Sequence, residues 1–332
     1  MLGVRNILKR VAAGEATAES ETRACLDRIA ERETAVGAWA FLDPARAVAE
    51  ARRRDQSRAK GPLHGVAVGI KDIFDTADMP TSYGSPIYAD HKPAADAACV
   101  ALLRAAGAVA LGKTVTTEFA MTHPGQTRNP HNPAHTPGGS SSGSAAAVAA
   151  GMVPVALGTQ TLGSVIRPAA FCGIVGFKPS YGAINRAGTK LISESADTIG
   201  LFTRSVADIP PVLAAFTGAP MESYDKTLDK APRIGLVRGV EWDKAAAPAQ
   251  AAFEDAAQRL AKAGASVRDV AVDPALTTAH ERSRIITGYE LARAYAYEWF
   301  NHRDQLSPAF ARNVADGMAI AFADYNNARA AF

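Results

Sequence analysis

Two repeating patterns of apolar and polar positions run through the chain and predict helices and strands in alternation. Thr17 is predicted to cap a helix with Glu19 and Glu21 in its first turn, and Asp43-Pro44 to begin another. Further helices are predicted over 93–106, 142–150 and 246–263. Ser205 and Asp208 form the pattern of a capping box, which predicts a helix start there, and two more helices are predicted to fill 275–331. Strands are predicted over 63–70, 108–111, 153–157, 234–237 and 267–272.

This order of elements predicts an α/β fold, in which a central, mixed and twisted β-sheet lies between helical layers. We expect one domain over 1–332. Within it, N-terminal helices occupy 1–60, the core with the candidate chemistry 61–225, and an extension 226–332. No internal repeat is evident, and the best candidate for a looser joint is the segment from Lys226 to Pro232.

Composition and charge narrow the class of protein. The chain has 332 residues, 48% of them hydrophobic, and a net charge of +3 with acidic and basic residues interspersed, so no nucleic-acid partner is expected. Because no run of 18 apolar residues and no apolar signal segment are present, we expect neither a membrane span nor a signal peptide. Three widely spaced cysteines argue against a disulfide framework and favour a cytoplasmic location.

The candidate chemistry lies in two glycine-rich turns and one apolar strand. Ser140 and Ser164 stand 24 residues apart, each in its own Gly-Ser turn. A serine hydroxyl is a weak nucleophile until a base takes its proton. Lys71 ends the apolar run that begins at Gly65, and a lysine buried in such surroundings loses its proton more readily.

Together these segments resemble the amidase signature family from about residue 15 to the end of the chain. The motifs that carry the resemblance are the Lys71 strand, Pro137-Gly138-Gly139-Ser140-Ser141-Ser142-Gly143, Gly163-Ser164-Val165-Ile166-Arg167-Pro168-Ala169, Gly112-Lys113-Thr114, Glu118-Phe119-Ala120 and Phe171-Cys172-Gly173-Ile174-Val175-Gly176-Phe177-Lys178-Pro179. The resemblance implies an amidase-signature fold and a triad in which Ser164 is the nucleophile, Ser140 bridges from a cis peptide bond and Lys71 is the base. It also implies an oxyanion hole made by the backbone amides of Thr161, Leu162, Gly163 and Ser164.

The chain departs from the family pattern at two positions. Leu162 stands where the family usually has glycine or another small residue, so the leucine is either strained by a positive φ or narrows the acyl pocket. Arg167 follows the nucleophile by three residues, an order that resembles the malonamidase-like branch with its small, carboxylate-bearing substrates. Arginine suits a carboxylate because its planar fork can bind both oxygens, although Arg167 could instead support the turn.

The resemblance therefore implies hydrolysis of a small carboxylic amide through an acyl-enzyme, with no cofactor or metal. If Arg167 binds a carboxylate, the amide is a carboxylate-bearing one. Ser141 and Thr159 are further candidates near the substrate, either orienting the proton relay or making ordinary turn hydrogen bonds. Two other functions stay open. One is an amidase-type component of a transamidase that supplies ammonia, and the other is a catalytically impaired relative.

The hypothesis of a catalytically impaired relative rests on Leu162 and, more strongly, on the length of the chain. Members of the family usually continue past the point where this chain stops, so we expect the last strands of the sheet to be missing. Apolar cover would then be lacking for Phe310, Phe322, Tyr325 and Phe332. An open sheet edge of this kind favours association, so a homodimer is possible.

Three other motifs favour different classes of protein, but the residues around each argue against it. Gly107 to Thr114 fits a phosphate-binding loop, yet its middle is a continuous apolar strand. Gly139 to Gly143 fits a nucleophile elbow, yet residues 128–137 before it cannot form a strand. His131 and His135 have the spacing of zinc ligands, but a proline lies between them and no acidic residue is near.

Overall fold

The computed structural model describes residues 3–58, 60–239, 241–273 and 278–331. The chain divides into two compact units, which are Met1–Asp225 with Thr287–Ile320, and Lys226–Ile286 with Ala321–Phe332. The boundary at Lys226 is the start of the looser joint proposed from the sequence. All the candidate site residues lie in the first unit.

The first unit is built on a six-stranded mixed sheet with the strand order β1-β3-β2-β4-β6-β5. Strand β2 runs parallel to β3 and β4 on either side, whereas β1, β5 and β6 pair in antiparallel fashion. The strands are β1 (Trp39–Leu42), β2 (Ala67–Lys71), β3 (Val109–Thr114), β4 (Val155–Gln160), β5 (Val175–Phe177) and β6 (Thr198–Thr203). The predicted mixed sheet is therefore confirmed.

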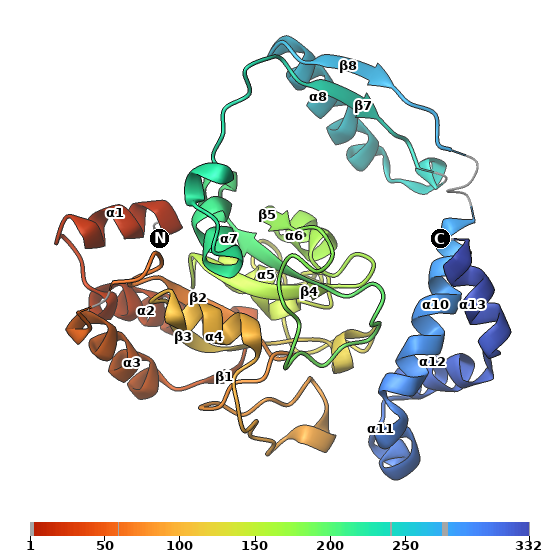
Figure 1. Ribbon diagram of the computed structural model, residues 1–332, viewed down its shortest axis with the longest axis horizontal. Coiled ribbons are helices and arrows are strands. Elements are labelled where there is room, and N and C mark those ends of the chain that lie inside the picture. Colours follow the sequence, from red (N-terminus) through yellow and green to blue (C-terminus); the bar gives the residue numbers. More distant parts are fainter. Residues whose placement is uncertain (1–2, 59, 240, 274–277, 332) are drawn as a thin grey trace. The chain divides into compact units, whose positions relative to one another are not determined.

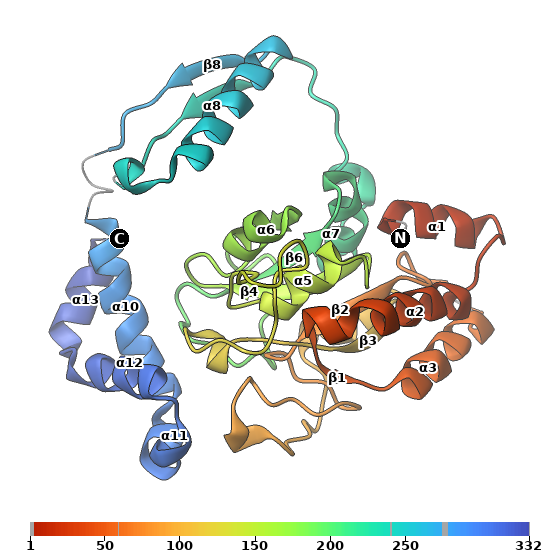
Figure 2. The same cartoon turned by 180° about the vertical axis from the view of Figure 1, so that it is seen from behind.

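Helices cover both faces of this sheet (Figures 1 and 2). Because successive strand residues point to opposite faces, Val68 and Leu157 join one buried apolar cluster, and Ala67 and Ala156 join another. Residues of α1 (Val4–Ala12), α4 (Ala98–Ala105) and α7 (Ile209–Thr217) complete the first cluster, and residues of α2 (Ala18–Val36), α5 (Ser142–Ala149) and α6 (Ile166–Cys172) the second. The predicted helical layers are confirmed.

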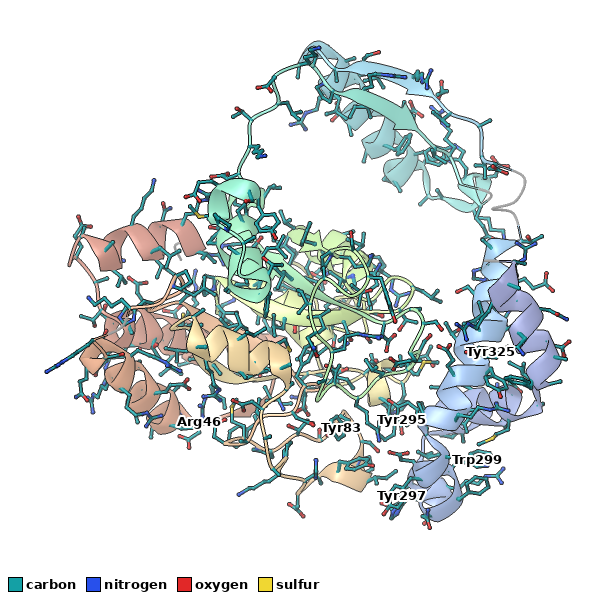
Figure 3. All side chains as sticks on the ribbon, viewed as in Figure 1. Arg46, Tyr83, Tyr295, Tyr297, Trp299 and Tyr325 are labelled. Atoms are coloured by element: carbon teal, nitrogen blue, oxygen red, sulfur yellow. The ribbon has the colours of Figure 1, made fainter. Side chains whose placement is uncertain are left out.

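Two predicted helix starts are confirmed by their caps. The Thr17 hydroxyl accepts a hydrogen bond from the backbone N–H of Ser20 at the start of α2. Asp43 accepts one from the N–H of Arg46 at the start of α3 (Pro44–Gln56), with proline in the first turn. The guanidinium of Arg46, labelled in Figure 3, then donates to the carbonyl of Leu111 and so ties α3 to β3.

Other predictions are wrong in position. Helix α4 begins at Ala98 and not at Pro93, and β4 continues to Gln160, three residues beyond its predicted end, because the pattern stopped at the last apolar residue. The capping box at Ser205 does not form, since the Asp208 carboxylate accepts from the N–H of Arg5 instead. Helix α1 was missed, although Val4, Ile7 and Val11 have helical spacing and are buried.

The predicted pair of helices over 275–331 is wrong. The described part of this segment holds α10 (Ala279–Ala294), α11 (Ala296–Asn301), α12 (Pro308–Ala319) and α13 (Phe322–Ala330), and residues 274–277 lie outside the described residues. Ser307 caps α12 ahead of a proline, which interrupts the continuous pattern. Phe310 does not lack apolar cover, because its ring lies 4.9 Å from Phe119 and 5.0 Å from Tyr295, centroid to centroid. Phe332 lies outside the described residues.

A polar and aromatic cluster fastens the Thr287–Ile320 segment to the rest of the first unit. The Lys190 ammonium pairs with the fully buried carboxylate of Glu298 on α11, which also accepts from the Tyr88 hydroxyl at 2.6 Å. Tyr83 and Tyr295, both labelled in Figure 3, face the same ammonium, with ring centroids 5.7 and 5.1 Å from it. The cluster joins segments more than 100 residues apart in the chain.

The second unit contains two parallel strands, β7 (Arg233–Leu236) and β8 (Ser266–Asp269), joined by α8 (Ala247–Lys262). Figure 1 shows α8 lying along the two strands. These elements agree with the sequence prediction to within a few residues. No helix in the described ranges is long and apolar enough to cross a membrane.

Candidate active site

Lys71 lies at the carboxyl end of β2, between β3 and β4, and its side chain is fully buried. Its ammonium nitrogen donates to the hydroxyls of Ser140, at 2.8 Å, and Thr159, at 2.7 Å. Burial lowers the pKa of Lys71 to about 7, and the nearby charge of Asp197 opposes this shift. A large fraction of Lys71 is therefore neutral near neutral pH, as a general base requires.

Ser140 is held in place by the start of α5 and by a neighbouring loop. The Gly139–Ser140 peptide bond is cis, and the carbonyl of Ser140 accepts from the N–H of Thr117 at 3.1 Å. Helix α5 itself sits close against the sheet, because a Cβ on Gly143 would lie 2.3 Å from both the carbonyl oxygen of Ala38 and the nitrogen of Val115. Only glycine at 143 allows the start of α5, which follows Ser140, to approach Ala38 and Val115 this closely.

Ser164 lies in the turn that joins β4 to α6 and is partly exposed. Within the described part of the chain, its hydroxyl has no hydrogen-bond partner, and neither have the backbone N–H groups of residues 161–164. Backbone donors left open beside a hydroxyl are what an oxyanion hole needs. Leu162 does not have a positive φ and its side chain is exposed, so strain, one of the two alternatives for this residue, is excluded. Narrowing of the acyl pocket stays a prediction.

Arg167 connects the two serine-bearing turns. Its Nε and Nη2 donate to the carbonyl oxygen of Gly139, at 3.2 and 2.7 Å. Arg167 lies in the first turn of α6, so this contact joins α6 to Gly139, the residue before Ser140. This contact is the supporting role that the sequence left open for Arg167, and the carboxylate role stays a prediction.

The Amidase family model matches residues 21–319 of the chain. This chain belongs to the Amidase family. The resemblance proposed from the sequence is confirmed, and the solved structures below share the predicted fold.

Relatives within the Amidase family include amidotransferase components as well as amidases. The glutamyl-tRNA(Gln) amidotransferase subunit of Chloroflexus aurantiacus is 39% identical over 309 residues, which cover 86% of this chain and 62% of the relative. The peptide amidase of Stenotrophomonas maltophilia has a TM-score of 0.84 and 34% identity, covering 99% of this chain and 78% of its own. Another amidase crystal structure has a TM-score of 0.90 and 31% identity, with 77% of its chain covered. This chain thus spans under two thirds of the length of the Chloroflexus amidotransferase subunit.

Two of the candidate residues in this Amidase family chain are buried and bonded to protein groups. The Ser141 hydroxyl donates to the carbonyl of Thr159 and accepts from its N–H, both at 3.3 Å. The Thr159 hydroxyl accepts from Lys71. Ser141 thus makes turn hydrogen bonds to the backbone of Thr159, and Thr159 contacts the lysine directly. An orienting role for the two hydroxyls stays a prediction.

Residues of the phosphate-loop and zinc motifs make structural contacts, which argue against those functions. Strand β3 contains most of the phosphate-loop pattern and is fully buried, and Lys113 in it pairs with Asp72 at 3.0 Å. A ring nitrogen of His131 lies 2.9 Å from the carbonyl oxygen of Cys172. Burial raises the pKa of the Cys172 thiol to about 12, which suits a packed side chain and not a nucleophile. Among the described residues no cluster of three or more His, Cys, Asp or Glu could hold a metal ion.

Two residues that the sequence did not single out also hold the Ser164 turn. The Gln160 side chain accepts from the N–H groups of Val165 and Ile166, at 2.8 and 2.9 Å, and donates to the carbonyl of Leu162 at 3.2 Å. Asp197 accepts a hydrogen bond from the Thr161 hydroxyl. Gln160 is the last residue of β4 and Asp197 directly precedes β6. A single polar residue at a strand end is too common to indicate such a contact from the sequence.

We expect Gln160→Leu to lower both stability and activity. The N–H groups of Val165 and Ile166 would lose their acceptor, and a buried unpaired donor costs about 1–3 kcal/mol. Ammonia release should fall roughly tenfold or more as the turn loosens. Gln160→Glu is the milder comparison and should lose less, since a carboxylate keeps both acceptor bonds and gives up only the donor to the Leu162 carbonyl. Thermal unfolding and ammonia release measure the effects, and equal stability of the Leu variant and the wild type would contradict this account.

Proposed function

We propose that this Amidase family chain hydrolyses the C–N bond of a small carboxylic amide to a carboxylate and ammonia. The observation that carries the proposal is the buried Lys71, hydrogen-bonded at 2.8 Å to the hydroxyl of Ser140, with its pKa lowered to about 7. A lysine in this state can accept a proton from a hydroxyl and return it to a leaving group.

The proposed reaction uses three side chains and the backbone N–H groups of one turn. Lys71 takes the proton of Ser164 through Ser140, and the Ser164 oxygen attacks the amide carbonyl. Backbone N–H groups of the turn formed by Thr161, Leu162, Gly163 and Ser164 stabilise the oxyanion, and each donor that bonds it lowers the barrier by about 3 kcal/mol. Protonated Lys71 returns its proton through Ser140 to the departing ammonia, and water then hydrolyses the acyl-enzyme.

A panel of small amides, assayed by ammonia release, tests the proposal directly. Release from at least one amide, lost on replacement of Ser164, is the expected result. A folded protein that releases no ammonia from any amide in the panel would favour the impaired relative. We further propose that both units form one amidase domain, supported by a family match that spans them. A homodimer and a cytoplasmic location stay predictions.

The variant Arg167→Ala tests whether the substrate carries a carboxylate. If its guanidinium also binds a carboxylate of the substrate, Arg167→Ala should raise KM for an acidic amide such as malonamate by about 10- to 100-fold, since a charge-assisted hydrogen bond contributes about 1.5–3 kcal/mol. The KM for a neutral amide of similar size should change less. Equal losses for the two amides would assign Arg167 to its contact with Gly139 alone.

A second function is favoured by the similarity to glutamyl-tRNA(Gln) amidotransferase components. The match of 39% identity over 86% of this chain supports an amidase-type component of an ammonia-supplying transamidase. Steady ammonia release by the purified chain alone would favour the free amidase. Release that appears only when a partner chain is co-expressed and co-purified would favour the transamidase component.

A further inference from the structure

Asp197 is a buried carboxylate that binds the first residue of the proposed oxyanion turn. It precedes β6 and is 4% exposed. One carboxylate oxygen accepts from the Thr161 hydroxyl, and the other accepts from the N–H groups of Ile192 and Ser193, at 2.7 and 3.3 Å. The carboxylate therefore joins the 192–193 loop to the turn that carries Ser164.

The charged groups around Asp197 come from several elements. Lys71 on β2 interacts with it electrostatically, and so does Tyr295. Arg186 donates to the backbone carbonyl of Asp197, at 3.2 Å, while Glu290 on α10 binds the neighbouring Ser193 hydroxyl. Among the described residues, no lysine or arginine lies within ion-pair distance of the Asp197 carboxylate.

The hydrogen bonds around Asp197 suit an ionised carboxylate. Two backbone N–H groups donate to one oxygen and the Thr161 hydroxyl donates to the other, and an ionised carboxylate accepts all three. Burial raises the pKa of Asp197 above its ordinary value, and these hydrogen bonds and Lys71 oppose that rise. A negative charge at this place favours the ammonium form of Lys71.

We propose that Asp197 is a positioning residue for the Ser164 turn and the base, acting through the Thr161 hydroxyl and through its charge near Lys71. This inference rests on the proposed amidase function. It assigns Asp197 two separable effects. One is the geometry of the turn, transmitted by the Thr161 hydrogen bond. The other is the proton affinity of Lys71, transmitted by charge.

Asp197→Asn separates charge from shape. The asparagine oxygen can accept from Ile192 and Ser193 while its NH₂ donates to the Thr161 hydroxyl, so all three contacts are kept without the charge. The pKa of Lys71 is read directly from its side-chain NMR resonance, assigned by its loss in Lys71→Met. We expect Asp197→Asn to lower this pKa by about one unit. The matched control is Glu194→Gln, an exposed carboxylate in the same loop, which should leave it unchanged.

Thr161→Val tests the geometric effect, because it removes the hydroxyl and keeps the charge. We expect a fall of about tenfold in kcat with the Lys71 pKa unchanged, and recovery in Thr161→Ser. In Asp197→Asn the acid limb of the pH–rate profile should move to lower pH, since less of Lys71 is then protonated.

The outcomes distinguish this inference from the proposed function. An unchanged Lys71 resonance titration in Asp197→Asn, together with wild-type kcat in Thr161→Val, would overturn it even if the protein is an active amidase. If no amide is hydrolysed, the proposed function fails, while the NMR titration still decides whether Asp197 sets the proton affinity of Lys71. Should Asp197→Asn not fold, kcat in Thr161→Val and its recovery in Thr161→Ser decide the positioning role.

Discussion

Replacing Ser164 by alanine is expected to reduce ammonia release by at least about 10⁴-fold, because no acyl-enzyme can form without the hydroxyl. The side chain is partly exposed and has no hydrogen-bond partner among the described residues, so the fold should be nearly unaffected. Ammonia release and thermal unfolding of the same preparation measure the two effects.

A matched control is available in the other serine-rich turn. Ser142 donates to the carbonyl of Val115 at 3.3 Å and has no proposed chemical role, so Ser142→Ala should lose less than about tenfold in activity. A fluorophosphonate probe should label Ser164 in the wild type. Labelling of Ser141 or Cys172 in its place would contradict the assignment of the nucleophile.

Replacing Lys71 by arginine is expected to abolish turnover, since a guanidinium cannot give up its proton near neutral pH. In the wild type, activity should fall as the pH drops through about 7, because protonation of Lys71 removes the base. Activity that persists in Lys71→Arg, or a flat pH profile between pH 5 and 8, would rule out this role.

The stability of the protein gives an independent check on the same group. The pKa of Lys71 is about 7 in the folded chain and about 10.5 in the unfolded chain. Between these two values the unfolded chain binds a proton that the folded chain does not, so stability rises with pH by about 1.4 kcal/mol per unit. Lys71→Met should lack this contribution, and denaturant unfolding of the two proteins at pH 6 to 9 compares them.

The sequence predicted the candidate site best where local composition sets local structure. Lys71 stands in an apolar run that becomes the central strand, and Ser140 in a glycine turn before a small-residue helix. Their contact at 2.8 Å required no more than those two predictions and the family resemblance. Helix α1 could have been predicted in the same way, since Val4, Ile7 and Val11 have helical spacing.

The remaining contacts could not be predicted because they join distant segments. Asp197 and Thr161 are 36 residues apart, and Arg167 and Gly139 are 28 apart. Which carbonyl an arginine binds depends on how two turns pack, and that information is not local. Leu162 shows the same limit, because its residue type left strain at a positive φ open and only the backbone angle of the folded chain excluded it.

The cluster around Lys190 bears on how the protein can be divided for study. A fragment ending at Asp225 would keep Lys190, Tyr83 and Phe119 but lose Glu298 and Tyr295, which neutralise and cover them. It would leave an unpaired ammonium among exposed rings, a surface prone to aggregation. A fragment meant to keep the first unit folded therefore has to include residues 287–320. They can be joined to it by a linker in place of the second unit, or supplied as a separate peptide.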